Sequence, residues 1–397
     1  MSPAETHIIK TEPEFRSLER EWNEFHDAAR GTVFQTFTWV WNWWKVYRNG
    51  RNDLHIIIAR IDGRLTAILP LYLERLGVVG VNLNRLRMIG VYETYGEYTI
   101  LTRPGESREP VRAIATELAR CLKRPGCDLV SLFRFPPESE AMGELMTGLR
   151  LQGLRGQFVP VVIKRVMMDL PPTWEEYLSG LSPNEREAIK RKTRSLIKNG
   201  AEVEVVGTPD RAAFEDYIRL HGESWKPRGV SGYFHSERFG RFLGDVTMDL
   251  MSRGQSRLYF LKKDGRRFAA VHAMFVNDQC CFYLSGLARN HELVSMSPGK
   301  VLLAKVIRDA IEEGYKIFDF QGGDEDYKFR LGGKMTSFAK AMFWPCDTRS
   351  VKIMVFLGVQ ALHQSLRWRV RDRLVPYVKT FLPAAWRNRP SFGRQPE

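Results

Sequence analysis

The sequence of 397 residues has few cysteines and none in a disulfide-forming or metal-binding pattern. The five cysteines are odd in number and include no CxxC pair, and Cys280 and Cys281 are adjacent within an apolar run. Such thiols are typical of a reduced, cytoplasmic protein. The pattern argues against a disulfide framework and against a cysteine-ligated zinc site.

Long apolar runs and nucleotide-binding motifs are also missing. The beginning of the chain, MSPAETHIIKTEPEF, has no apolar signal core, and no window reaches the roughly 20 apolar residues of a membrane-spanning helix. There is no GxGxxG after a first strand and no GxxxxGK[ST], so the sequence supports neither a dinucleotide fold nor a P-loop nucleotidase. Asp324, Glu325 and Asp326 lack the alternating ligands of a calcium loop, so we expect no metal site.

Acidic residues are too few to balance the basic ones. Lysine and arginine number 60 against 46 acidic residues, and the formal net charge is +14. This excess of positive charge favours an anionic partner. The charge alone does not distinguish among nucleic acid, acidic lipid and a phosphorylated small molecule. With 44% hydrophobic residues and this length, the chain can form two cores.

The second half has the clearest pattern of secondary structure. Asp264-Gly265 and Asn277-Asp278 are turn sequences between apolar runs, and Ser297-Pro298-Gly299 begins a stretch with helical spacing that Gly314 can end. The predicted strands are Arg257–Lys263, Arg267–Val276, Gln279–Leu287 and Tyr315–Phe320. An antiparallel meander followed by a strand–helix–strand crossover predicts a parallel pair within a mixed sheet.

The first half repeats this order about 200 residues earlier. Strand-like runs flank Asp62-Gly63, and a helical segment over 111–124 precedes a strand over 127–135. Aromatic-rich helical segments, Trp39–Tyr47 and Phe214–Trp225, precede the two halves. The repeated order indicates an internal duplication of one α/β unit. We therefore predict domains over residues 1–165 and 166–345, followed by a basic helical tail over 346–397.

Two basic segments have more than one interpretation. The helix predicted after Ser182 has a capping residue, Pro183 at its first position and Glu185 for a capping box. Its basic residues from Arg186 to Lys198 could be a solvated surface or could line a groove for anions. The tail alternates apolar and basic residues, so it could lie on an anionic membrane or pack on the first half.

The beginning of the helix at Ser297 is the strongest candidate for binding an anion. The first amides of a helix lack partners within the helix, and its dipole places partial positive charge there. Gly299 has no side chain to block a diphosphate, and Lys300 adds charge. The helix lies in a crossover of an α/β unit, where ligands tend to bind.

Three stretches resemble a known family. LSPNEREAIKRKTRSL, SPGKVLLAKVIRDAIEEGYKIFDF and the Asp–Tyr–Lys run in DFQGGDEDYKFRLG resemble the acyltransferase domain of the GNAT superfamily. The sequence is more similar to the group named after the cellulose-biosynthesis protein CelD, which is distantly related to the FemAB aminoacyl transferases. The resemblance covers Leu170 to about Pro345 and implies tandem GNAT-like units with acyl-coenzyme A, such as acetyl-coenzyme A, as donor.

The resemblance assigns roles to individual residues. Coenzyme A pyrophosphate would bind near Ser297, Gly299, Lys300 and Val301, although the usual Q/RxxGxG/A of GNAT domains is replaced by HELVSMSPGK. The first half has no glycine at its matching helix, so we expect one donor site per chain.

The same resemblance makes Tyr327 the general acid that protonates the leaving thiolate. Asp319, Asp324 or His272 could be the base, although His272 lies in the strand-like FAAVHAMF and could equally be a core residue. Lys328, Arg330 and Gly323 could contact the acceptor.

Three functions remain open. The first is an acyl-coenzyme A-dependent N- or O-acyltransferase that acts on a saccharide precursor or on another small amine or alcohol. The second is a FemAB-type ligase that uses aminoacyl-tRNA, which the positive charge favours. The third is a non-catalytic scaffold at membrane-associated polysaccharide synthesis. If the tail binds anionic membrane, the cytoplasmic protein would be peripheral at the inner face.

Overall fold

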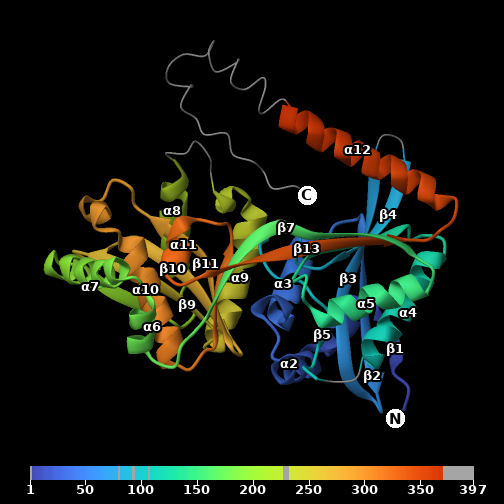
Figure 1. Cartoon of the computed structure of the whole chain (residues 1–397), viewed down its shortest axis with the longest axis horizontal. Coiled ribbons are helices and arrows are strands. Elements are labelled where there is room, and N and C mark those ends of the chain that lie inside the picture. The colour runs from blue at the N-terminus through green and yellow to red at the C-terminus, as the bar shows by residue number, and fades with distance from the viewer. Residues whose placement is uncertain (1, 79–80, 92–93, 106–107, 227–231, 370–397) are drawn as a thin grey trace.

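The computed structural model describes residues 2–78, 81–91, 94–105, 108–226 and 232–369. Within these residues one mixed sheet of 13 strands runs through both halves, with helices on its faces (Figure 1). The strand order is β1-β2-β3-β4-β6-β13-β7-β12-β11-β10-β9-β8, and β5 pairs with β3. The predicted mixed α/β fold with two repeated units is therefore confirmed.

The bounds of the strands are as follows: β1 Glu5–Ile9, β2 Asn52–Ile61, β3 Arg64–Val78, β4 Val81–Met88, β5 Leu101–Thr102, β6 Leu129–Phe135, β7 Arg155–Asp169, β8 Glu202–Val206, β9 Ser256–Lys263, β10 Arg266–Val276, β11 Gln279–Leu287, β12 Ile317–Gly322 and β13 Lys334–Trp344. The α-helices are α1 Glu12–Ser17, α2 Glu19–Ala28, α3 Phe37–Tyr47, α4 Glu109–Lys123, α5 Glu140–Leu151, α6 Trp174–Gly180, α7 Pro183–Lys198, α8 Arg211–Trp225, α9 Glu237–Ser252, α10 Pro298–Glu312, α11 Asp326–Arg330 and α12 Arg349–Arg369.

The two halves contain the same sequence of local structures. Asp264-Gly265 and Asp62-Gly63 each have positive φ at both residues, as the tightest hairpin turns require. A parallel pair follows each hairpin: β11 pairs with β12 after the α10 crossover, and β4 pairs with β6 after the α4 crossover. The meander and the parallel pair predicted from the sequence are therefore confirmed.

Two long strands join the halves into one sheet. β7 and β13 are antiparallel partners from Lys334↔Met167 to Trp344↔Arg155. One end of β7 pairs with β12 of the second half, whereas β13 pairs with β6 of the first half. The two strands run side by side between the lobes (Figure 1). The domain boundary predicted at 165/166 lies inside β7.

Aromatic side chains fill the contact between the lobes. Trp39 of α3 is edge-on to Phe242 of α9, with ring centroids 5.0 Å apart, and to Tyr283 of β11 at 5.7 Å. Trp39 is fully buried. A second core lies between α10 and the sheet of the second half and includes Leu302, Val306, Ile307, Phe268 and Phe318.

The described part of the tail packs on the first half. Ile353 and Phe356 of α12 are buried against Leu129 and Trp344. Arg349 donates hydrogen bonds to the carbonyl oxygens of Lys123, Arg124 and Cys127, at the end of α4. Of the two interpretations of the tail, packing on the first half is thus observed for α12. The predicted tail residues after Arg369 lie outside the described residues.

Candidate active site

The beginning of α10 leaves one amide available. Ser297 adopts the left-handed conformation, with φ 57° and ψ 56°, and Pro298 follows as the first helical residue. The amides of Lys300 and Val301 donate to the Ser297 carbonyl at 3.0 and 3.4 Å. The Gly299 amide has no acceptor among the described residues, and a Cβ built on Gly299 would meet nothing within 4 Å. Backbone and space at this position therefore suit an anion.

Two lysines lie beside this helix start. Lys192 of α7 donates to Ser297 Oγ at 2.6 Å, and Lys300 forms an ion pair with Glu185 at 2.5 Å. Burial lowers the pKa of Lys192, and the nearby charge of Lys300 lowers it further. Glu185 pairs with Lys300 alone and acts on Lys192 only through its charge, so net positive charge remains at the helix start. The Glu185 carboxylate is engaged with Lys300, and Ser182 Oγ caps α7 by accepting from the Glu185 amide at 3.3 Å.

β11 and β12 separate soon after they pair. Their hydrogen-bonded register covers three residue pairs, from Gln279↔Ile317 to Cys281↔Asp319. Beyond it β11 continues along β10, while β12 has a bulge before Gly322 and continues along β7. Gln321 lies in this bulge with φ 62°, and its Nε2 contacts Cys281 Sγ at 3.1 Å.

A buried charge network holds β12 to β7 at this point. Arg165 Nε and Nη2 donate to Asp319 Oδ1 and Oδ2 at 3.2 and 2.6 Å, and Arg165 Nη1 donates to Glu97 at 2.6 Å. Burial alone would lower the pKa of Arg165, but the charges of Asp319 and Glu97 hold it above its ordinary value. Asp319, predicted as a possible base, is therefore engaged in a fully buried pair. The sequence analysis missed Arg165 and Glu97, which are 68 residues apart.

Tyr327 lies at the surface, on the short helix α11 that follows β12. Its side chain is 36% exposed. Partial burial of the hydroxyl and the charge of Glu325 raise the pKa of Tyr327. The hydroxyl therefore stays protonated throughout the neutral range, as a general acid requires.

The predicted acceptor contacts differ in how accessible they are. Lys328 is 3% exposed and donates to the Gly322 carbonyl at 2.6 Å. It therefore stabilises the loop between β12 and α11 and is not available to an acceptor substrate. Arg330 is exposed and pairs with Asp326 at 3.3 Å. Gly323 has φ 102°, and a Cβ there would lie 2.5 Å from a carboxylate oxygen of Glu325, so this turn requires glycine.

Comparison with protein families identifies the domain that carries these residues. Residues 183–329 match the family model of the acetyltransferase (GNAT) domain. The matched residues lie within the second half of the chain and end before β13. The recognition of the superfamily from the sequence is therefore confirmed, whereas membership of the CelD group stays a prediction.

Solved structures resemble the whole chain in fold. FemX aligns with a TM-score of 0.63 at 12% identity, over 88% of this chain and 99% of FemX. A conserved protein of unknown function from Bacteroides thetaiotaomicron has a TM-score of 0.51 at 12% identity, over 85% and 99% of the two chains. L-PGS from Bacillus licheniformis has a TM-score of 0.50 at 13% identity, over 87% and 96%. At such identities the likeness concerns the fold alone, and a search of curated proteins finds no match.

Within the GNAT domain, the remaining candidate bases are unfavourably placed. Asp324 is exposed and pairs with Lys164 at 2.6 Å, and this hydrogen bond and charge lower the pKa of Asp324. His272 is fully buried on β10, where its Nε2 contacts Ser256 Oγ at 2.9 Å. Burial lowers the pKa of His272 to about 3. Asp319, Asp324 and His272 are therefore each paired or buried, and the roles of acid and base stay predictions.

Side chains of the first half approach the GNAT domain next to α11. The ring of Tyr95 lies against Gly322, where a Cβ would be 2.1 Å from its Cε1. Arg134 of β6 lies over the Tyr95 ring, with 4.6 Å from Cζ to the centroid. Burial and the charge of Tyr95 raise the pKa of Tyr233 to about 12, although Arg134 opposes this. The first half therefore contributes part of the surroundings of the β12–α11 loop.

The described residues contain no group of three or more histidine, cysteine, aspartate or glutamate side chains that could hold a metal ion. Nor do they contain a helix long and apolar enough to cross a membrane.

Proposed function

We propose that the chain is an acyl-coenzyme A-dependent N- or O-acyltransferase whose donor binds to the second half. The observation that carries this proposal is the beginning of α10 in the matched GNAT domain. It combines an available Gly299 amide, open space at its Cα and the cations Lys192 and Lys300. Helix starts of this kind bind pyrophosphate groups.

The departure from the usual glycine pattern of GNAT domains affects how strongly the proposed site would bind the pyrophosphate. Pro298 supplies no N–H, and the Lys300 and Val301 amides are used within the turn. Only one amide of the first turn is therefore available, and the two lysines would supply most of the attraction to the pyrophosphate. The buried Val301 would act as packing below the site rather than as a direct contact.

In the proposed reaction, the acceptor amine or hydroxyl attacks the thioester carbonyl and gives up its proton to solvent water. The carbon–sulfur bond breaks, the thiolate takes a proton from Tyr327, and water returns a proton to Tyr327. The place of Tyr327 on the short helix α11, directly after β12, supports this role, whereas its raised pKa keeps the hydroxyl protonated but makes it a weaker acid. The acceptor would approach from the side of the first half, near Tyr95 and Arg134. A saccharide precursor is our proposal for its class, because the chain resembles the CelD group in sequence.

Binding of acetyl-coenzyme A tests the proposal. The native protein should show saturable binding and the Gly299→Val variant should lose it, because the branched side chain would occupy the space of the pyrophosphate. Gly143→Val in α5 is a matched control, since a Cβ there also meets nothing within 4 Å. Tyr327→Phe should retain binding and lower kcat about 100-fold or more. Absence of binding by the native protein would refute the proposal.

The second candidate function is a FemAB-like ligase that takes its acyl group from aminoacyl-tRNA. The fold likeness to FemX over 99% of that chain and the basic surface of α7 favour it. It predicts tRNA binding that weakens steeply with added salt. Binding of tRNA without binding of acetyl-coenzyme A would favour the ligase.

A further inference from the structure

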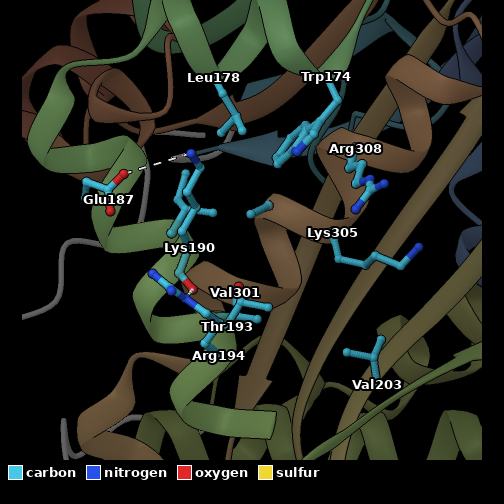
Figure 2. A pocket seen from close by; sticks show the side chains of 12 residues that line it. Trp174, Leu178, Glu187, Lys190, Thr193, Arg194, Val203, Val301, Lys305 and Arg308 are labelled. Atoms are coloured by element: carbon cyan, nitrogen blue, oxygen red, sulfur yellow. Dashed lines mark hydrogen bonds and ion pairs between the residues drawn. The ribbon is translucent and has the colours of Figure 1, made fainter.

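A pocket of about 590 Å³ lies on the outer side of α10, between α6, α7 and β8 (Figure 2). It is within the usual size range of small-molecule sites. Its apolar lining consists of Trp174, Leu178, Ile189, Val203, Val301 and Ala304. Most of these side chains are aliphatic, so the surface suits a hydrocarbon chain.

Four cations, one carboxylate and the hydroxyl-bearing Thr193 complete the lining. The charged residues are Lys190, Arg194, Lys305, Arg308 and Glu187. Figure 2 shows them around the apolar side chains, with Lys190 and Arg194 coming from α7 and the other two cations from α10.

Pairing with carboxylates neutralises only part of this positive charge. Lys305 and Arg308 have partners along α10, Asp309 at 2.5 Å and Glu312 at 2.7 Å. Lys190 is 3.9 Å from Glu187, which is a weak pair. Arg194 donates to a backbone carbonyl at 3.4 Å and has no carboxylate partner among the described residues.

We propose that this pocket binds a single-chain anionic amphiphile, a molecule with an aliphatic chain and a phosphate or carboxylate head. The chain would lie on the apolar lining, and the head would contact Arg194 and Lys190. The basic C-terminal tail is a poor alternative occupant, because residues 370–397 contain six arginines or lysines against two acidic residues. The pocket shares Val301 with the proposed donor site, but its lining includes neither Gly299 nor Lys192.

Calorimetric titration of the full chain with decyl phosphate, below its micelle-forming concentration, tests the proposal. We expect saturable binding with one molecule per chain, at least tenfold weaker binding of butyl phosphate, and at least tenfold weaker binding of the neutral decyl glucoside. Vesicles of phosphatidylcholine with and without lysophosphatidic acid, a phosphate lipid with one chain, show whether the pocket can also take its ligand from a bilayer. Retention on the anionic vesicles alone would support the proposal with lipid as its source.

Two exposed positions of α7 provide matched variants. Arg194→Glu should weaken decyl phosphate binding at least tenfold, whereas Lys198→Glu, with the same charge change outside the pocket, should alter it less than twofold. Equal binding of decyl phosphate and decyl glucoside would overturn the proposal, as would equal effects of the two variants. Displacement of decyl phosphate by coenzyme A would also overturn it, because the pocket would then belong to the donor site. Gly299→Val should leave decyl phosphate binding intact.

Discussion

Replacement of Arg165 by methionine removes the cation from the charge network between β7 and β12. Arg165 and Asp319 are 2% and 1% exposed, and the Glu97 side chain is 13% exposed. Methionine keeps an unbranched apolar side chain, but it loses the guanidinium that lies over the Phe338 ring and leaves two carboxylates without their counter-charge. Loss of one partner from a buried ion pair typically costs about 3–5 kcal/mol. Asp319 still accepts from the Gln321 amide at 2.8 Å, so we expect the lower end, about 3 kcal/mol.

Urea unfolding, followed by circular dichroism and by tryptophan fluorescence, measures this cost; coincident transitions would justify a single free energy of unfolding. The double variant Arg165→Met/Asp319→Asn should recover about 1–2 kcal/mol, because asparagine carries no charge and still accepts from the amide. Arg308→Met is the control, since its pair with Glu312 is about half exposed on both sides and should be worth less than about 1 kcal/mol. A cost of Arg165→Met no larger than that of the control would refute the reasoning, as would a double variant that is less stable than Arg165→Met.

Three further predictions concern charge and the tail. Since the pKa of Lys192 is lowered, donor affinity should fall as the pH rises through that pKa, and Lys192→Met should weaken binding and remove this dependence; binding titrations between pH 7 and 10 measure both. The folded-state pKa of His272, about 3, lies below its unfolded value of about 6.5, so its contribution to stability is complete above pH 6.5 and falls as the pH drops. At pH 4.5 the loss is about 3 kcal/mol, and His272→Met should lose that much less stability between pH 7 and 4.5. If α12 contacts membrane, Val351→Asp/Met354→Asp should reduce co-sedimentation with anionic vesicles; Leu151→Asp, at another exposed apolar residue, should not, and equal binding of all three proteins would exclude that contact.

The sequence predicts those parts of the fold that depend on neighbouring residues. The Asp-Gly turns need positive φ at two consecutive residues, and α10 begins at a proline and ends before Gly314, which has φ 84°. These features can be recognised in a few letters, and so can the crossover that makes β11 and β12 parallel. The same locality explains why Gly299 could be proposed before its surroundings were known.

The remaining features depend on contacts between distant residues. β13 follows the GNAT domain in sequence but pairs with β6, about 200 residues earlier, and no local pattern encodes that partner. The charge network joins Glu97, Arg165 and Asp319 through three separate elements, so Asp319 was predicted to be available as a base. Lys192 points to Ser297 because α7 packs against α10. The sequence does not show this packing, so it presents Lys192 only as one of the basic residues on α7.

The two halves also show why one donor site per chain is expected. Both have a parallel pair of three residues and a bulge with a left-handed residue on the second strand, Arg134 in β6 and Gln321 in β12. The helices before these strands begin differently. α4 has Glu109 and Pro110 in its first turn, and the Glu109 carboxylate accepts from the Ala4 amide at 2.5 Å. A fixed negative charge at a helix start opposes a second anion there, whereas α10 has no acidic residue in its first turn and two lysines beside it. The duplicated fold thus retains the strand geometry in both halves, and the charge at the helix start restricts the proposed donor to the second.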